Sequence, residues 1–125
     1  FTFSTTGYWG DVSVSSVVYD TYQITVDMPL YLNVTAASGI TVDITAEDQV
    51  LSTLVLLGGD SNSDDQIELS DAAIIGSAYG TVPGDTFWDP DADINGDGVI
   101  NILDLTLMGG NYGATSISAY SGWTP

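Results

Sequence analysis

Two acidic stretches of the chain carry oxygen-bearing side chains at the spacing that a metal-binding loop requires. In the second stretch, from Asp93 to Asp104, donors stand at loop positions one, three, five, seven, nine and twelve. Alternate residues of a tightly turning loop point inward, so these oxygens can converge on one hard cation, and Gly98 permits the sharp bend. Six or seven oxygens at about 2.4 Å suit calcium better than magnesium, which demands a tighter octahedron. The expected ligands are Asp93, Asn95, Asp97, the backbone carbonyl of Val99, Asn101 and Asp104.

The first stretch, from Asp60 to Asp71, has the same spacing with one departure, because Asp65 stands where glycine is expected. Aspartate tolerates a left-handed backbone better than most residues, at some cost in strain. Four carboxylates at ligand positions, against three in the second stretch, strengthen the attraction for a cation. These effects oppose each other, so the sequence predicts two Ca²⁺ ions and leaves the order of their affinities open. The expected ligands are Asp60, Asn62, Asp64, the backbone carbonyl of Gln66, Glu68 and Asp71.

The two stretches are copies of one internal repeat, offset by 33 residues. A solvated turn is the alternative reading of a stretch rich in Asp and Asn, and two copies in register argue against it. The identical pairs are Asp60 and Asp93, Asn62 and Asn95, Asp64 and Asp97, Ile67 and Ile100, Asp71 and Asp104, Gly76 and Gly109, Tyr79 and Tyr112, and Gly80 and Gly113.

The composition of the chain excludes several classes of function. Its 125 residues include no lysine, arginine, histidine or cysteine, and 17 acidic side chains give a formal net charge of −17. Without cationic side chains it cannot neutralise phosphates, which excludes nucleic acid and anionic membrane surfaces. It also lacks the nitrogen and sulfur ligands that zinc and copper prefer. Carboxylate-pair catalysis is disfavoured, because the clustered carboxylates are assigned to calcium and Asp27 and Asp43 lie on strand faces without a partner. We therefore expect no enzymatic activity.

Alternating apolar and polar residues predict a β region over residues 1–57, which we treat as the first domain. About six short strands are fewer than the seven strands and about 100 residues of a self-sufficient sandwich. Either the sheet buries its face on the C-terminal half of the chain, or a neighbouring molecule supplies a strand. Ser38 and Gly39 predict a turn between two of the strands. The predicted strands are Phe1–Phe3, Val12–Val14, Tyr22–Met28, Leu30–Ala36, Ile40–Ile44 and Val50–Leu57.

A short apolar helix is predicted after each acidic loop, over Leu69–Ala78 and Ile102–Asn111, with Gly80 and Gly113 as C-caps. No helix is predicted before either loop. A duplicated loop with only its exiting helix resembles the type I dockerin module over residues 58–113. The motifs that carry this resemblance are GDSNSDDQIELSDAAII and ADINGDGVINILDLTLM, and the aspartate at loop position twelve also matches the dockerin form.

The β region that leads into the first loop resembles the end of a carboxypeptidase-regulatory-like β-sandwich. The expected fold is therefore mainly β with a small α module: an incomplete, sandwich-like sheet followed by a dockerin-like pair of calcium loop–helix motifs. The dockerin resemblance implies attachment to a cohesin through the two helices. Loop positions ten and eleven, often a polar pair in that family, are Leu69–Ser70 and Ile102–Leu103 here. Such apolar residues favour packing on a partner surface or on the chain's own sheet.

Residues 114–125 extend beyond the dockerin-like module as a tail in which Ile117, Ala119 and Trp123 alternate with polar residues. The tail either adds as a strand to a neighbour's sheet, which yields a fibre, or folds back as an intramolecular clasp. Asn33 begins a glycosylation sequon.

We interpret the chain as an extracellular or cell-surface structural protein that calcium stabilises and that self-assembles through β-strand addition into a surface filament or matrix. The alternative is a dockerin-type module that binds a cohesin-like partner. No apolar run approaches the roughly 20 residues that span a bilayer, so no membrane insertion is expected.

Overall fold

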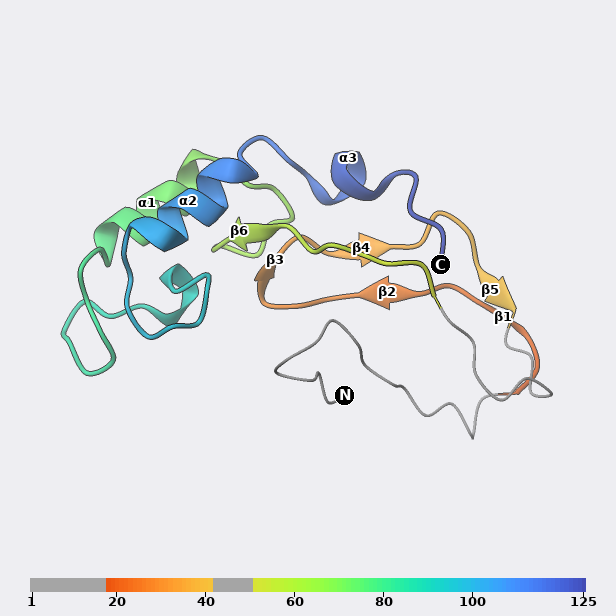
Figure 1. Ribbon diagram of the computed structural model, residues 1–125, viewed down its shortest axis with the longest axis horizontal. Coiled ribbons are helices and arrows are strands. Elements are labelled where there is room, and N and C mark those ends of the chain that lie inside the picture. The colour runs from red at the N-terminus through yellow and green to blue at the C-terminus, as the bar shows by residue number, and fades with distance from the viewer. Residues whose placement is uncertain (1–17, 42–50) are drawn as a thin grey trace.

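The computed structural model describes residues 18–41 and 51–125, with paired strands in its N-terminal part and short helices in its C-terminal part (Figure 1). This agrees in outline with the predicted β region and small helical module, but the predicted strand Val50–Leu57 is wrong over its described residues 51–57, which lie in no strand. The predicted strands at Phe1–Phe3 and Val12–Val14 lie outside the described residues, as does Asp43. The strands are β1 (Thr21–Tyr22), β2 (Thr25–Val26), β3 (Leu30–Tyr31), β4 (Val34–Thr35), β5 (Ile40–Thr41) and β6 (Gly58–Asp60). The helices are α1 (Leu69–Ser77), the 3₁₀ turn η1 (Pro90–Ala92), α2 (Ile102–Gly110) and α3 (Ser116–Tyr120).

Residues 21–26 run antiparallel to residues 34–41, because β1 pairs with β5 and β2 pairs with β4. Side chains alternate as the sequence predicts: Leu32, Val34 and Ala36 are buried, whereas Thr35 between them is exposed. The period of two therefore places one apolar face of this segment toward the core.

The chain reverses at Met28–Tyr31, and the turn predicted at Ser38–Gly39 is wrong. β4 and β5 pair with the same antiparallel segment, so residues 37–38 form a bend within one direction of travel. In the reversal, the Tyr31 amide donates to the Met28 carbonyl at 3.1 Å, with Pro29 at the second turn position. The third position needs a positive φ, and Leu30 adopts 69° there. A sequence pattern that relies on glycine misses such a turn.

β3 and β6 pair antiparallel and join the β region to the first acidic loop, since β6 ends at Asp60. Gly59 lies at φ 124°, and a Cβ atom at this position would be 2.7 Å from the Cα of Met108 in α2. Only glycine lets the strand approach the helix this closely. Gly58 and Gly59 are therefore a packing contact rather than a flexible linker.

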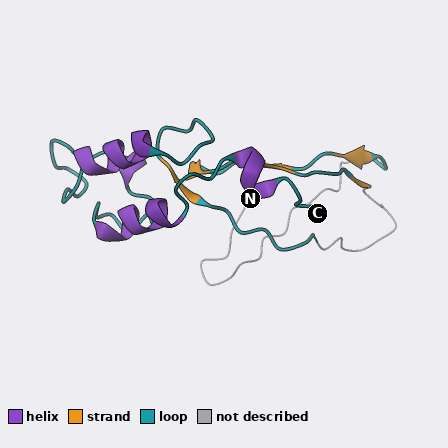
Figure 2. Cartoon of the chain, turned by 90° about the horizontal axis from the view of Figure 1, so that it is seen from above, coloured by secondary structure: helices purple, strands orange, loops and turns teal. Residues whose placement is uncertain are grey.

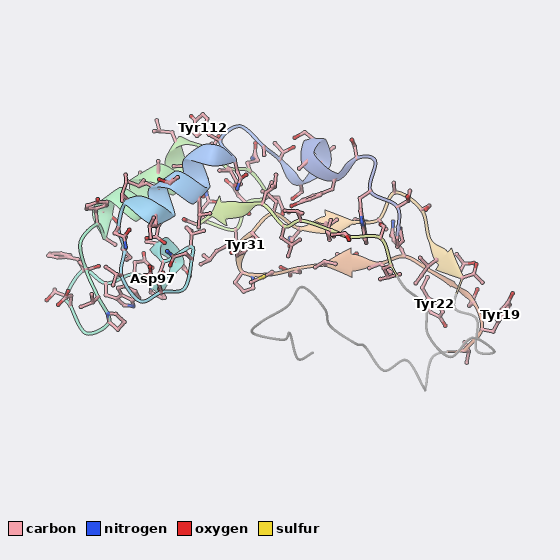
Figure 3. All side chains as sticks on the ribbon, in the orientation of Figure 1. Tyr19, Tyr22, Tyr31, Asp97 and Tyr112 are labelled. Atoms are coloured by element: carbon pink, nitrogen blue, oxygen red, sulfur yellow. The ribbon has the colours of Figure 1, made fainter. Side chains whose placement is uncertain are left out.

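One hydrophobic core runs through the described part of the chain. It joins Leu32 and Val34 of the β region to Ile67, Ile100 and other residues of the repeats. Tyr31 lies at this junction beside β6, and its hydroxyl donates to the Ile94 carbonyl at 3.5 Å (Figure 3). The β region thus buries its apolar face on the C-terminal half of the same chain, as the first of the two sequence-based readings proposed.

The C-terminal tail folds back along its own chain. Residues 116–120 form the short helix α3, and Thr115 caps it by accepting a hydrogen bond from the Ser118 amide at 3.1 Å. α3 lies over β4 (Figures 1 and 2). The buried Tyr120 accepts a hydrogen bond from the Leu57 amide at 2.7 Å, and the Ala37 amide donates to the Trp123 carbonyl at 2.9 Å. These contacts correspond to the intramolecular clasp.

α1 and α2 lie side by side at the end of the molecule opposite the β1–β5 pair (Figures 1 and 2). Each helix ends one residue before its predicted end. Gly80 and Gly113 are not the C-caps, which are Ala78 and Asn111, but they do have positive φ angles of 84° and 85°. Among the described residues, none of the helices is long and apolar enough to cross a membrane.

Candidate metal centres

A buried aspartate at position twelve organises each acidic loop. Asp71 lies in the first turn of α1 with 0% exposure, and its carboxylate accepts hydrogen bonds from the Asn62 amide at 3.2 Å and the Glu68 amide at 2.8 Å. Asp104 in α2 is equally buried and accepts from Asn95 and Asn101 at the same two distances. Each carboxylate therefore fastens its loop to the start of its own helix.

The position-one aspartates close the loops from the other side. Asp60 accepts hydrogen bonds from the amides of Asp64 at 3.0 Å and Asp65 at 2.9 Å. Asp93 accepts in the same way from the amides of Asp97 at 3.2 Å and Gly98 at 2.9 Å. Such Asx-type hydrogen bonds, made within the chain itself, hold the backbone of each loop in a tight turn.

Positions three and five face each other within each loop. The side-chain amide of Asn62 donates to Asp64 at 2.9 Å, and that of Asn95 donates to Asp97 at 3.0 Å. Figure 3 shows Asp97 in the second loop. The structure thus brings positions one, three, five and twelve together by the same set of hydrogen bonds in both copies.

Positions seven and nine lie where each loop joins its helix. The Val99 carbonyl accepts a hydrogen bond from the side chain of Asn101, whose own oxygen caps α2 by accepting from the Leu103 amide. Glu68 is exposed at the start of α1 and accepts from the Ser70 hydroxyl at 3.2 Å. Gln66 forms a β-bridge with Thr115.

The first loop buries negative charge. Burial raises the pKa of the Asp60 carboxyl, and the carboxylates of Asp71 and Asp64 act in the same direction, while the amides of Asp65 and Asp64 oppose them. The sequence has no cationic side chain to offset the buried carboxylates of Asp60 and Asp71. Uncompensated buried charge is costly, so an external cation would stabilise the fold.

The donors suit a hard cation such as calcium, because all of them are oxygens of carboxylates, amides and carbonyls. Within residues 18–41 and 51–125, no three acidic side chains form a metal site by themselves. The expected shells contain four carboxylates in the first loop and three in the second, together with an amide oxygen at position three and a carbonyl at position seven. The described arrangement does not gather either set of carboxylates by itself, so both ligand sets stay predictions.

Short backbone hydrogen-bonded pairings connect the two repeats. The Ile67 amide, from the first repeat, donates to the Ala114 carbonyl at 2.9 Å, and the Gly113 amide donates to the Ile67 carbonyl at 2.8 Å. Correspondingly, Ile100 pairs with Gly80 and Thr81 at 2.8 and 3.1 Å. Each loop is therefore held by the segment that follows the other repeat's helix, a pairing that no local sequence pattern predicts.

Asn33, the candidate glycosylation site, is half-buried between the core residues Leu32 and Val34. Its side-chain carbonyl oxygen is enclosed without a hydrogen-bond partner in the described structure, and its backbone amide donates to Asp65 at 3.1 Å. This position leaves little room for a bulky glycan.

Neither α1 nor α2 exposes a charged side chain. The only acidic residues of these helices, Asp71 and Asp104, are buried. In α2, Ile102 and Leu103 are 60% and 54% exposed. We use the name helix face for the exposed large apolar residues of the two helices and of the segments next to their ends, which are Leu69, Tyr79, Val99, Ile102, Leu103, Leu107 and Tyr112.

No protein-family model matches the chain, and no curated protein sequence matches it. It is similar to two crystal structures of interface mutants of the type II cohesin–X-dockerin complex from Acetivibrio cellulolyticus. A chain of the C-terminal interface mutant matches with a TM-score of 0.69 and 26% identity, over 83% of this chain and 69% of that chain. The N-terminal interface mutant gives a TM-score of 0.68 with the same identity and coverage. The chain therefore has a fold found in cohesin–dockerin complexes.

Proposed function

We propose that the chain is a non-enzymatic, calcium-binding interaction module whose helix face docks on a cohesin-like partner. The observation that carries this proposal is the helix face itself, a set of exposed apolar residues on and next to α1 and α2. The acidic loops fix the first turn of each helix through Asp71 and Asp104. Exposed apolar patches on soluble proteins commonly mark interaction sites. The similarity to solved cohesin–X-dockerin complexes supports the class of partner.

Calcium has a structural role in this proposal. Asp60, Asn62, Asp64, Glu68, Asp71 and the Gln66 carbonyl would hold one ion, and their counterparts in the second repeat would hold the other. Two ions would reduce the formal net charge from −17 to −13. Because only the folded loops present these oxygens together, calcium binding would stabilise the folded state.

The charge pattern indicates the chemistry of the partner. The helix face carries no formal charge, whereas the exposed acidic side chains Asp64, Glu68 and Asp97 lie in the loops beside it. The chain has no cationic side chain to meet an acidic partner. The best complement is an apolar patch bordered by lysine or arginine.

We place this interaction outside the cell or at its surface, where millimolar calcium suits loops of this type. Self-assembly into a filament or matrix is a second proposal from the sequence. Strand donation by the tail is disfavoured, because residues 114–124 contact their own chain at Ile67, Leu57 and Ala37. Sedimentation velocity in a few millimolar calcium tests it: a single species near 13.1 kDa argues against a polymer.

Calorimetric titration tests the main proposal. The probe is the cohesin module of the similar type II complex, and the chain is titrated with it in calcium and in excess chelator. Leu103→Ser removes an exposed apolar side chain of the helix face and should weaken binding about tenfold or more. The matched control is Ile117→Ser, since Ile117 is 83% exposed on α3, away from the helix face. Equal weakening by both variants would contradict the proposed face.

A further inference from the structure

Asp65 connects the first acidic loop to two other parts of the chain. One carboxylate oxygen accepts hydrogen bonds from the Asn33 amide at 3.1 Å and from the Ser116 hydroxyl at 2.8 Å. Its backbone carbonyl accepts from the Ser116 amide at 3.1 Å. Asn33 immediately precedes β4, and Ser116 begins α3. A single side chain thus joins the loop, the β region and the tail.

The second loop has no equivalent connection. Gly98 stands 33 residues after Asp65, adopts a similar positive φ of 82° against 65°, and has no side chain. Glycine is the residue that this backbone conformation favours, so the aspartate in the first loop is accommodated at a cost in strain. Its two side-chain hydrogen bonds supply a reason for that cost.

The backbone of Asp65 belongs to the proposed metal loop itself. Its amide donates to Asp60 at position one, and its neighbours Asp64 and Gln66 are the expected ligands at positions five and seven. A cation that fixes Asp60, Asp64 and Gln66 would therefore fix the backbone of Asp65 and the direction of its carboxylate. Residues that belong to one rigid turn become ordered or disordered together.

We propose that Asp65 is a positioning residue that couples calcium binding in the first loop to the seating of the tail and of the residues before β4. This inference rests on the proposed calcium loops. Calcium orders the first loop, Asp65 transmits that order to Asn33 and Ser116, and the tail then closes over the β region. The second loop, with Gly98, orders only its own repeat.

Amide hydrogen exchange of the full chain, with and without calcium, tests the coupling. The Asn33 amide reports the Asp65 contact directly, while the amides of Ala37 and Leu57 report tail seating because they donate to Trp123 and Tyr120. In the wild-type protein, calcium should slow exchange at all three amides. In Asp65→Gly, that calcium-dependent slowing should fall about tenfold at Asn33, the scale of a lost hydrogen bond to a charged group. It should also fall at Ala37 and Leu57.

Two further variants separate the side chain from the backbone. Ser63→Gly is the matched control, because Ser63 also has a positive φ, 56°, in the same loop, whereas the contacts to Asn33 and Ser116 come from Asp65. Its calcium-dependent slowing at the three amides should equal that of the wild type. Asp65→Asn keeps an oxygen acceptor and should restore part of the calcium-dependent slowing.

Calorimetric calcium titration, run in parallel, distinguishes two kinds of failure. If Asp65→Gly binds two ions and keeps the full calcium-dependent slowing at Asn33, Ala37 and Leu57, the coupling is overturned while the calcium loops stand. If the wild-type chain binds no calcium, the proposed function fails and the coupling fails with it.

Discussion

The two repeats share one loop design but differ in what surrounds it. Positions one, three, five and twelve make the same hydrogen bonds in both, and Asp71 and Asp104 are equally buried. The first repeat is entered through the paired strand β6 and touches the tail through Asp65, whereas the second is entered through η1 and has glycine at the corresponding position. The duplicated positions carry the expected calcium ligands, and the divergent positions attach one copy to the rest of the chain.

Removing calcium should produce the largest effect, because it acts on both copies. If each site is saturated at about 100 times its Kd, its loss lowers the free energy of unfolding by about 2.7 kcal/mol per site. Thermal unfolding in calcium and in excess chelator measures the difference. Identical curves under the two conditions would contradict a structural role for the metal.

The position-twelve aspartates test whether the copies are equivalent. Asp71→Ala and Asp104→Ala each leave two loop amides without an acceptor and remove a buried cap, so each should cost about 3 kcal/mol. Denaturant unfolding in chelator isolates this contribution from calcium binding. Losses of unfolding free energy that differ by more than twofold would show that Asp71 and Asp104 are not equivalent.

Opposite substitutions at the two loop entrances should both destabilise the chain, by different amounts. Gly59→Ala forces a side chain against α2 at a positive φ and should cost about 2 kcal/mol. Its counterpart in the second repeat is Ala92, buried in η1, where Ala92→Gly should cost about 1 kcal/mol. Denaturant unfolding of both variants measures the difference. A neutral Gly59→Ala would mean that α2 does not pack closely on β6.

The left-handed positions provide the smallest and sharpest test. Ser63 and Gly96 are counterparts with φ angles of 56° and 69°. Ser63→Gly should raise the free energy of unfolding by about 0.5 kcal/mol, and Gly96→Ser should lower it by a similar amount. Both are measured by thermal unfolding in chelator. Asp65→Gly should break this pattern and destabilise the chain, because it also removes the bonds to Asn33 and Ser116.

Much of the repeat architecture could be predicted from the sequence, because duplication doubles every local signal. The helices end within one residue of their predicted ends, and Asp65 has the left-handed backbone expected of it. The alternation around Leu32 and Val34 also gave the correct buried face. The metal itself and its ligand roles remain predictions.

The remaining features depend on contacts that no local pattern encodes. The reversal at Met28–Tyr31 places Leu30 at a positive φ, where a sequence pattern expects glycine. The tail has a strand-like alternation, yet the cap at Thr115 and the contacts of Tyr120 favour a helix there. The partners of Asp65 are distant in sequence, and only the folded chain brings them together.

The backbone pairings of Ile67 and Ile100 with the opposite repeat determine how the two repeats could be separated. Each half of the module completes the other, so the two halves resemble the subunits of an obligate heterodimer that happen to share one chain. The connection through residues 82–89 keeps their concentrations matched rather than shaping their interface. A chain cut within this connection should yield two fragments that fold poorly alone and recover their structure on mixing.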